Sequence, residues 1–220
     1  MKFDNTYKQE INNLEEGKLQ SLALAGLLAA GAPEMASGAS RAINRPATTS
    51  ISPKSPTDQN LVNSTVDLTA WGEGFRDTMY LDSVGVPTIG YGTNLKEPKN
   101  VEALRSLGYD IKRIMKKSQK ISDADAKKLM HSGLYQAVRD ARALVPNFDS
   151  HPLKMKMILT DMSYNMGKTR LSGFHDFLAN LSQKNYNGVK KEMIDSHWYK
   201  QTGKRSKALV SMMDEVIKGA

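Results

Sequence analysis

Residues 71–95 read WGEGFRDTMYLDSVGVPTIGYGTNL, and this stretch decides the fold of the chain. Its first residues complete a segment, 68–75, that has the features of a helix end, because two glycines loosen the last turn. The following part, 77–92, has the chemistry of two β-strands separated by a turn at 82–85. The sequence therefore predicts a helix that leads directly into a tight β-hairpin.

Two carboxyl groups stand in this stretch, Glu73 at the helix end and Asp82 in the hairpin turn, and we expect them to lie near each other across a groove. Glycoside hydrolysis needs such a pair, one carboxyl protonated and the other ionised. Trp71 and Phe75 are apolar neighbours that favour the protonated form of Glu73, whereas water and backbone amides favour the anion of Asp82. A Glu at a helix end and an Asp in a turn also occur in purely structural roles, so these residues alone leave both interpretations open.

The returning strand of the hairpin carries Thr88 and Gly90, which alternate to one face. Together with Gly85 and Gly92, Gly90 keeps this face free of side chains. We therefore expect a ligand to approach the backbone there.

The spacing of these residues resembles a known family. Glu73 is followed by eight residues and Asp82, then by five residues and Thr88, and then by Ile89-Gly90-Tyr91-Gly92 without a gap. This pattern is similar to the active-site hairpin of the phage-type lysozymes, glycoside hydrolase family 24, the family of the T-even bacteriophage lysozyme. Looser matches follow in the expected order at Asn165-Met166-Gly167 and at 196–205, so the resemblance covers roughly residues 65–215.

The resemblance implies an α+β, mostly helical fold with two lobes. A small lobe would carry the β-hairpin, and a long helix would join it to a larger helical lobe. The residues supply that helix independently, because Ser122 is a good N-cap and the apolar positions of 123–144 follow a period of 3.6 residues before Pro146 ends the run. A buried helix over 152–165, closed by Gly167, would follow.

The resemblance also implies the activity: hydrolysis of the β-1,4 bond between N-acetylmuramic acid and N-acetylglucosamine in peptidoglycan, with inversion. Glu73 would be the general acid, and Asp82 and Thr88 would hold the attacking water. It places an arginine, Arg205, near the catalytic Glu. The substrate-binding residues that it implies are Tyr164, Asn165, Gln201, Thr202 and Arg205.

Two alternatives stay open at this point. A lytic transglycosylase would use a single essential Glu and leave anhydro-sugar ends, and a non-catalytic peptidoglycan-binding component of a phage particle would keep the fold without the chemistry. The three interpretations share bacterial peptidoglycan as partner, and a monomer is expected. No cofactor or metal is expected, because the chain has no cysteine and its four histidines do not have metal-ligand spacing.

The chain before the hairpin divides into two parts. Residues 1–32 are expected to be a leader with a short apolar segment at 19–32, for which a partner-binding helix, an export or anchor signal and an unstructured tail remain alternatives. Residues 33–64, rich in Pro, Ser and Thr, are expected to be an extended linker, and residues 65–220 the lysozyme-like catalytic domain. The resemblance implies synthesis in the host cytoplasm and action on the periplasmic cell wall, with an exported or virion-associated form, attached through 1–32, left open.

The net charge of +8 is placed unevenly, because the first 60 residues hold only six of the 31 basic residues and six of the 23 acidic ones. A basic folded domain favours an anionic partner. Five cations between residues 112 and 120 are expected to form one basic face of a helix over 110–119. Nucleic acid is not the expected partner, because no aromatic residues interleave with these cations.

Overall fold

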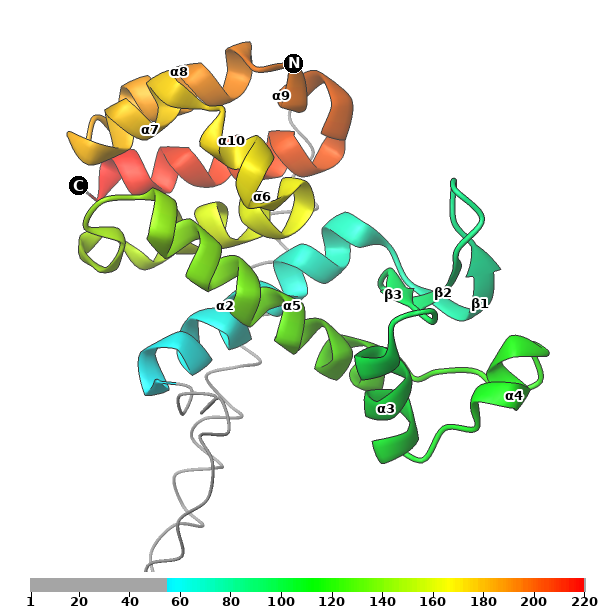
Figure 1. Cartoon of the computed structure of the whole chain (residues 1–220). Helices are drawn as coiled ribbons and strands as arrows, with labels where there is room; N and C mark the ends of the chain where they lie inside the picture. Colours follow the sequence, from blue (N-terminus) through cyan, green and yellow to red (C-terminus); the bar gives the residue numbers. More distant parts are fainter. Residues whose placement is uncertain (1–54, 220) are drawn as a thin grey trace, which may run out of the picture. The chain divides into compact units, whose positions relative to one another are not determined.

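The computed structural model describes residues 55–219 (Figure 1). The expectations for the leader and for linker residues 33–54 lie outside this range. The helices are α2 (Pro56–Glu73), α3 (Pro98–Ser106), α4 (Ile111–Met115), α5 (Asp123–Leu144), α6 (Leu153–Ser172), α7 (His175–Ser182), α8 (Tyr186–Asp195), α9 (His197–Thr202) and α10 (Lys204–Lys218), with a 3-10 turn η1 (Phe148–Ser150). The strands are β1 (Arg76–Leu81), β2 (Pro87–Gly90) and β3 (Thr93–Asn94). The expected α+β, mostly helical fold is confirmed.

The folded domain begins earlier than the sequence suggested. Ser55 caps α2 by accepting a hydrogen bond from the backbone N–H of Asp58 at 3.1 Å, and Pro56 stands at the first helical position, where its missing N–H does no harm. Leu61 and Val62 are already buried in the core. The prediction of a linker over 33–64 is therefore wrong for residues 56–64, because a proline that was read as a linker residue begins a helix.

The helix end and hairpin lie where they were predicted. α2 ends at Glu73, Gly74 follows with φ +78°, and β1 pairs with β2 in antiparallel register, Tyr80 opposite Thr88. A short third strand, β3, was not predicted; it pairs with β2 and completes a three-stranded sheet in the order β1-β2-β3. The fully buried Ile89 of β2 fixes this sheet to the core.

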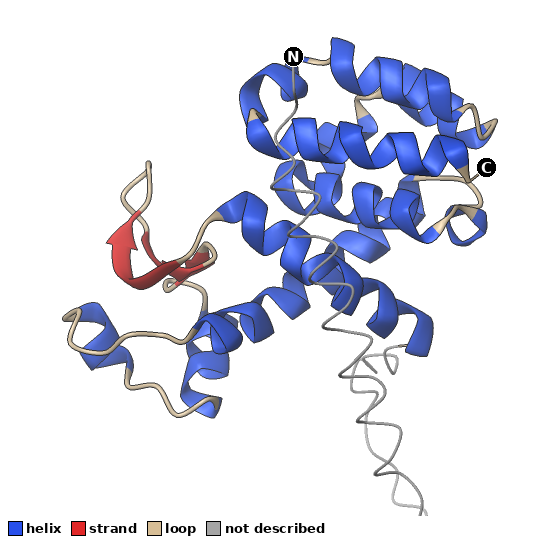
Figure 2. Ribbon diagram, turned by 180° about the vertical axis from the view of Figure 1, so that it is seen from behind, coloured by secondary structure: helices blue, strands red, loops and turns tan. Residues whose placement is uncertain are grey.

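Helix α5 joins the small sheet to the helices that follow it. Its N-terminus contacts β2, β3 and α3, and its length packs along α2 and α6 (Figure 1). As predicted, Ser122 caps it, and its side chain accepts from the backbone N–H of Asp125 at 3.1 Å. Figure 2, seen from behind, shows the three strands set apart from the group of helices that follows α5.

Gly167 interrupts α6, as expected, with φ +76° and ψ 161° in a residue range that is otherwise helical. A left-handed φ of this kind is readily adopted only by glycine. The direction of the chain therefore changes just after Tyr164 and Asn165.

Two expectations about the small lobe are wrong. Gly90 has φ +66°, and a Cβ there would lie 2.9 Å from the Cβ of Ala126 in α5, so the backbone at Gly90 packs against a helix and is not open to a ligand. Helix α4 ends at Met115, and Lys117 has a left-handed φ of 57°, so the cations at 112–120 do not share one helical face. Lys120 instead forms an ion pair with Asp77 at 2.7 Å.

Within residues 55–219, no helix is both long enough and apolar enough to span a bilayer.

Candidate active site

Glu73, the last residue of α2, is held by Arg205 from the start of α10. The Nη1 atom of Arg205 donates to Oε1 of Glu73 at 2.5 Å, across 132 residues of sequence. The Glu73 side chain is 27% exposed, whereas that of Arg205 is 4% exposed. One side of this carboxyl group is therefore fixed by the protein while another side meets solvent.

A second carboxylate, Asp161 of α6, holds the same arginine from within the core. Nε and Nη2 of Arg205 donate to the two oxygens of Asp161, each at 2.8 Å, and the hydroxyl of Thr69 donates to Oδ1 of Asp161, also at 2.8 Å. Asp161 is completely buried. Burial opposes the charge of Arg205, but Asp161 and Glu73 outweigh it and raise its pKa above the ordinary value, so the guanidinium stays charged.

Gly72 provides the room for this arrangement. A Cβ at this position would lie 3.1 Å from Cζ and from Nε of Arg205, closer than an ordinary van der Waals contact. The guanidinium therefore lies against the bare backbone of the last turn of α2. This explains a glycine inside a helix, where it is otherwise unfavourable.

The apolar neighbours expected around Glu73 have other contacts. The Phe75 ring packs on Tyr91 with centroids 5.3 Å apart, and Lys204 lies 4.8 Å above the ring of Trp71. The direct partner of Glu73 is the guanidinium of Arg205, as the resemblance implied.

Asp82 shapes the hairpin turn. Its Oδ1 atom accepts from the backbone N–H of Val84 at 2.9 Å and from that of Val86 at 2.8 Å. Both of these hydrogen bonds use the same oxygen, so Oδ2 is left to meet water or a ligand. The side-chain orientation is thus fixed by the turn itself.

Thr88 is bound to the same turn. Its hydroxyl donates to the carbonyl of Val86 at 3.0 Å, and that carbonyl also accepts from the backbone N–H of Asp82. Val86 therefore links the two side chains that the sequence predicted to act together. Thr88 is buried, and its hydroxyl oxygen keeps lone pairs that can accept from a further donor.

Tyr164 lies beside the charged group and lines a cavity of about 480 Å³. Burial and the nearby charge of Glu73 raise the pKa of Tyr164 to about 12, so its hydroxyl stays neutral. The cavity joins both lobes, because Lys99 of α3, Gly133 and Gln136 of α5 and the 163–167 part of α6 all line it.

Asn165, Gln201 and Thr202 meet in a larger cavity of about 810 Å³ among α6, α7, α8 and α9. The Nε1 atom of Trp198 donates to Oδ1 of Asn165 at 3.0 Å, and the hydroxyl of Thr202 donates to the carbonyl of Trp198, also at 3.0 Å. Neither Glu73 nor Asp82 lines this cavity. Both cavities use residues of α6: Ser163, Tyr164 and Gly167 line the smaller one, and Asn165 and Met166 the larger.

Arg205 differs from the other residues expected to bind substrate. It is buried beneath α2 and lines neither of these two cavities. Its guanidinium instead binds the carboxylates of Glu73 and Asp161, so a direct contact with substrate stays a prediction.

Sequence reasoning missed two residues here, Asp161 and Ser163. Asp161 stands among the apolar residues of α6, and a charged residue on a buried helix face was the signal that could have found it. The hydroxyl of Ser163, buried beside the smaller cavity, has no hydrogen-bond partner within the described part of the chain. Nothing in its sequence context distinguishes it.

Across residues 55–219 no three His, Asp or Glu side chains come together in a way that would hold a metal ion.

The comparisons with known proteins agree with this geometry. The family model described as phage lysozyme matches residues 71–213, and the chain belongs to this family. It is 28% identical over 162 residues to probable T4-type lysozyme 2 of Dictyostelium discoideum, covering 70% of this chain and 95% of that protein. Probable T4-type lysozyme 1 of the same organism is 27% identical with the same coverage. The pre-baseplate central spike protein Gp5 of Enterobacteria phage T4 is 27% identical over 69% of this chain and 28% of its own length.

Proposed function

We propose that this chain is a muramidase that hydrolyses the β-1,4 bond between N-acetylmuramic acid and N-acetylglucosamine in peptidoglycan. The observation that carries the proposal is the state of Glu73, a carboxyl group fixed on one side by a buried arginine and exposed on the other, within electrostatic range of Tyr164 in a cavity between the lobes. Membership of the phage lysozyme family supports peptidoglycan hydrolysis at the level of the family.

Glu73 is the general acid in this mechanism. As the glycosidic bond breaks, its electron pair goes to the leaving oxygen of N-acetylglucosamine, and that oxygen takes the proton of Glu73. Because Arg205 holds Oε1, the proton is delivered from the other carboxyl oxygen, Oε2. Such positioned proton transfer contributes roughly 10² to 10⁴ in rate.

Asp82 and Thr88 hold the water. Oδ2 of Asp82 accepts one hydrogen of the water, and the hydroxyl oxygen of Thr88 accepts the other while it continues to donate to Val86. The water oxygen forms the new bond to the anomeric carbon of N-acetylmuramic acid, and Asp82 takes its proton. The irregular pairing of β1 between Arg76 and Tyr80 supports this role, because a bulge bends a strand and re-aims the turn beyond it.

The glycan would run past Tyr164 and Ser163 and continue over Asn165 into the larger cavity, where Gln201 and Thr202 offer polar groups. Attack by water on the face opposite the leaving group inverts the anomeric carbon and needs carboxyls about 6.5–9.5 Å apart. The product is then expected first as the α-anomer.

Mass spectrometry of digested, purified peptidoglycan tests this proposal. The wild-type protein should release fragments with reducing N-acetylmuramic acid ends, and Asp82→Asn should lower their rate of release by about 10² or more. Anhydro-sugar ends together with an active Asp82→Asn variant would assign the chain to the lytic transglycosylases instead.

A non-catalytic role in a phage particle is the second candidate, favoured by the similarity to the central spike protein Gp5. It predicts that the chain sediments with peptidoglycan but releases no sugar ends of either kind. Release of reducing ends by the purified chain excludes it.

A further inference from the structure

Arg205 carries one positive charge and faces two carboxylates that differ in their surroundings. Asp161 is fully buried. It accepts hydrogen bonds from two N–H groups of Arg205 and from the hydroxyl of Thr69. Glu73 takes one N–H group and is partly exposed. The inner carboxylate is therefore the stronger partner of the guanidinium, since bidentate charge-assisted hydrogen bonds are among the strongest in proteins.

The net charge of this group depends on Glu73 alone. With Glu73 protonated, Arg205 and Asp161 cancel and the three side chains are neutral. With Glu73 ionised, one negative charge remains in a partly desolvated place, which is unfavourable. An arginine with no inner carboxylate would instead hold Glu73 as an anion, unable to donate a proton.

We propose that Asp161 is a positioning residue for the reaction: it neutralises Arg205 from inside, so that Arg205 orients Glu73 without keeping it ionised. This inference rests on the proposed function, in which Glu73 is the general acid. The charged and titratable groups near Glu73 are Arg205 from α10, Asp161 and Tyr164 from α6, and, more remotely, Lys204 above Trp71.

The experiment compares two isosteric substitutions, Asp161→Asn and Asp149→Asn. Each removes one carboxylate charge from an arginine that has a second carboxylate partner, and Asp149 pairs with Arg142, away from both cavities. The readout is the rate of release of reducing ends from peptidoglycan as a function of pH.

In Asp161→Asn the loss of activity at high pH should move to lower pH by about one unit or more, because an unbalanced guanidinium favours the ionised form of Glu73. Asp149→Asn should keep the wild-type profile. A folded Asp161→Asn protein with the wild-type profile, or with activity lowered equally at every pH, overturns the inference.

Carboxyl-carbon NMR gives a readout that needs neither activity nor substitution. Following both carboxyl resonances of the wild-type protein with pH shows which group takes up the proton: uptake by Glu73 supports the inference, and uptake by Asp161 overturns it. If the wild-type protein releases no sugar ends, the proposed function fails, whereas the NMR result still decides the role of Asp161.

Discussion

Two arginines, Arg142 and Arg205, each lie between two carboxylates, and each ties one end of helix α2 to another helix. Arg142 of α5 binds Asp58 in the first turn of α2, and Arg205 of α10 binds Glu73, its last residue. The Arg142 side chain is 33% exposed and that of Arg205 4% exposed. The pairing at the start of the helix therefore centres on a partly exposed arginine, and the pairing at its end on a buried one.

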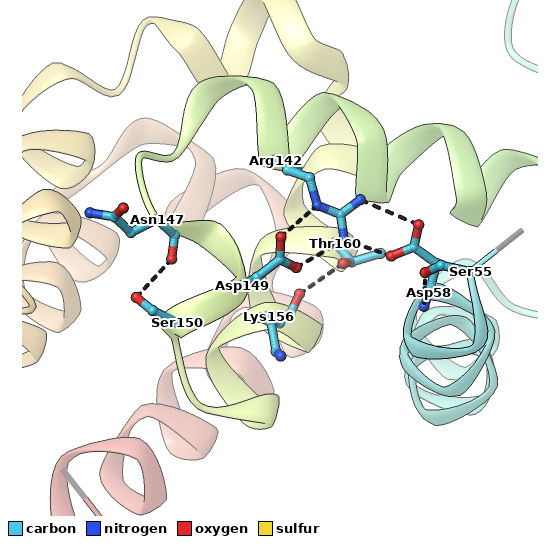
Figure 3. Close-up of polar contacts among 8 residues, drawn as sticks. All are labelled: Ser55, Asp58, Arg142, Asn147, Asp149, Ser150, Lys156 and Thr160. Atoms are coloured by element: carbon cyan, nitrogen blue, oxygen red, sulfur yellow. Dashed lines mark hydrogen bonds and ion pairs between the residues drawn. The ribbon is translucent and has the colours of Figure 1, made fainter. Parts of the chain in front are cut away.

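The cluster around Arg142 joins α2, α5 and η1. Figure 3 shows the guanidinium of Arg142 between Asp58 and Asp149. Its Nη2 atom donates to Asp58 at 2.6 Å and to Asp149 at 3.0 Å. Asp149 and Asp58 raise the pKa of Arg142, and Arg142 lowers that of Asp149, so Arg142 and Asp149 stay charged. Water reaches Asp149, whose side chain is 61% exposed, and screens the charge there.

The buried cluster has an outer carboxylate that meets solvent and an inner one that does not. On the proposed mechanism, this asymmetry lets the outer carboxyl, Glu73, transfer a proton.

Removing the arginine from each cluster should give the largest difference between them, measured as loss in the free energy of unfolding. Arg205→Ala leaves Asp161 buried without its counter-charge and should lower the free energy of unfolding by about 3–5 kcal/mol. Arg142→Ala leaves no completely buried carboxylate without its counter-charge, since Asp58 and Asp149 are 19% and 61% exposed, and should cost about 1 kcal/mol. Urea unfolding of both variants measures this, and equal losses would show that burial does not distinguish the clusters.

A smaller effect is expected from crowding the buried arginine. Gly72→Ala places a methyl group 3.1 Å from the guanidinium and should lower the rate of peptidoglycan hydrolysis about tenfold by shifting Arg205, and with it Glu73. Its stability should change little, because alanine favours the helix by about 0.5–1 kcal/mol and offsets the crowding. A rate equal to that of the wild type would show that the position of Arg205 is not critical.

The smallest effect concerns a buried polar contact that has no counter-charge. His151 lies against the hydroxyl of Tyr186 at 2.9 Å, and burial, helped by the charge of Lys184, lowers the pKa of His151. Because the folded pKa lies below the unfolded value of about 6.5, His151 stabilises the fold above that pH, and this stability is lost as the pH falls through the folded pKa.

Thermal unfolding between about pH 7 and pH 5 measures this effect. The melting temperature of the wild type should fall more steeply with decreasing pH than that of His151→Gln. His175→Gln, at an exposed histidine, should keep the wild-type slope. Parallel slopes for all three proteins would contradict the assignment.

Local patterns were enough to predict much of the fold. The Ser122 cap, the period of α5 and the turn at Asp82 each depend on residues close in sequence, and each was found where expected. The failures have local causes too: a proline begins α2, and a left-handed residue at Lys117 follows the end of α4. The spacing of residues alone does not distinguish a proline that begins a helix from one in a linker. Nor does it distinguish a short helix that ends at Met115 from a longer one.

The site was predictable only in part. Glu73, Asp82 and Thr88 lie within 16 residues and carry a recognisable spacing, whereas the contact between Thr69 and Asp161 spans 92 residues and that between Glu73 and Arg205 spans 132. Such pairings depend on how helices pack, which periodicity does not reveal. The apolar pattern of α6 therefore concealed Asp161.

We propose that the two ends of α2 carry carboxylates with unlike roles, chemical at Glu73 and structural at Asp58. The most direct test is the rate at which Glu73→Gln and Asp58→Asn release reducing ends from purified peptidoglycan, since each substitution removes the charge of the α2 carboxylate that binds an arginine. Glu73→Gln should release reducing ends about 10²-fold or more slowly than the wild type, and the rate of Asp58→Asn should stay within about twofold of it. Near-normal activity of Glu73→Gln, or an equal loss in both variants, would contradict the account.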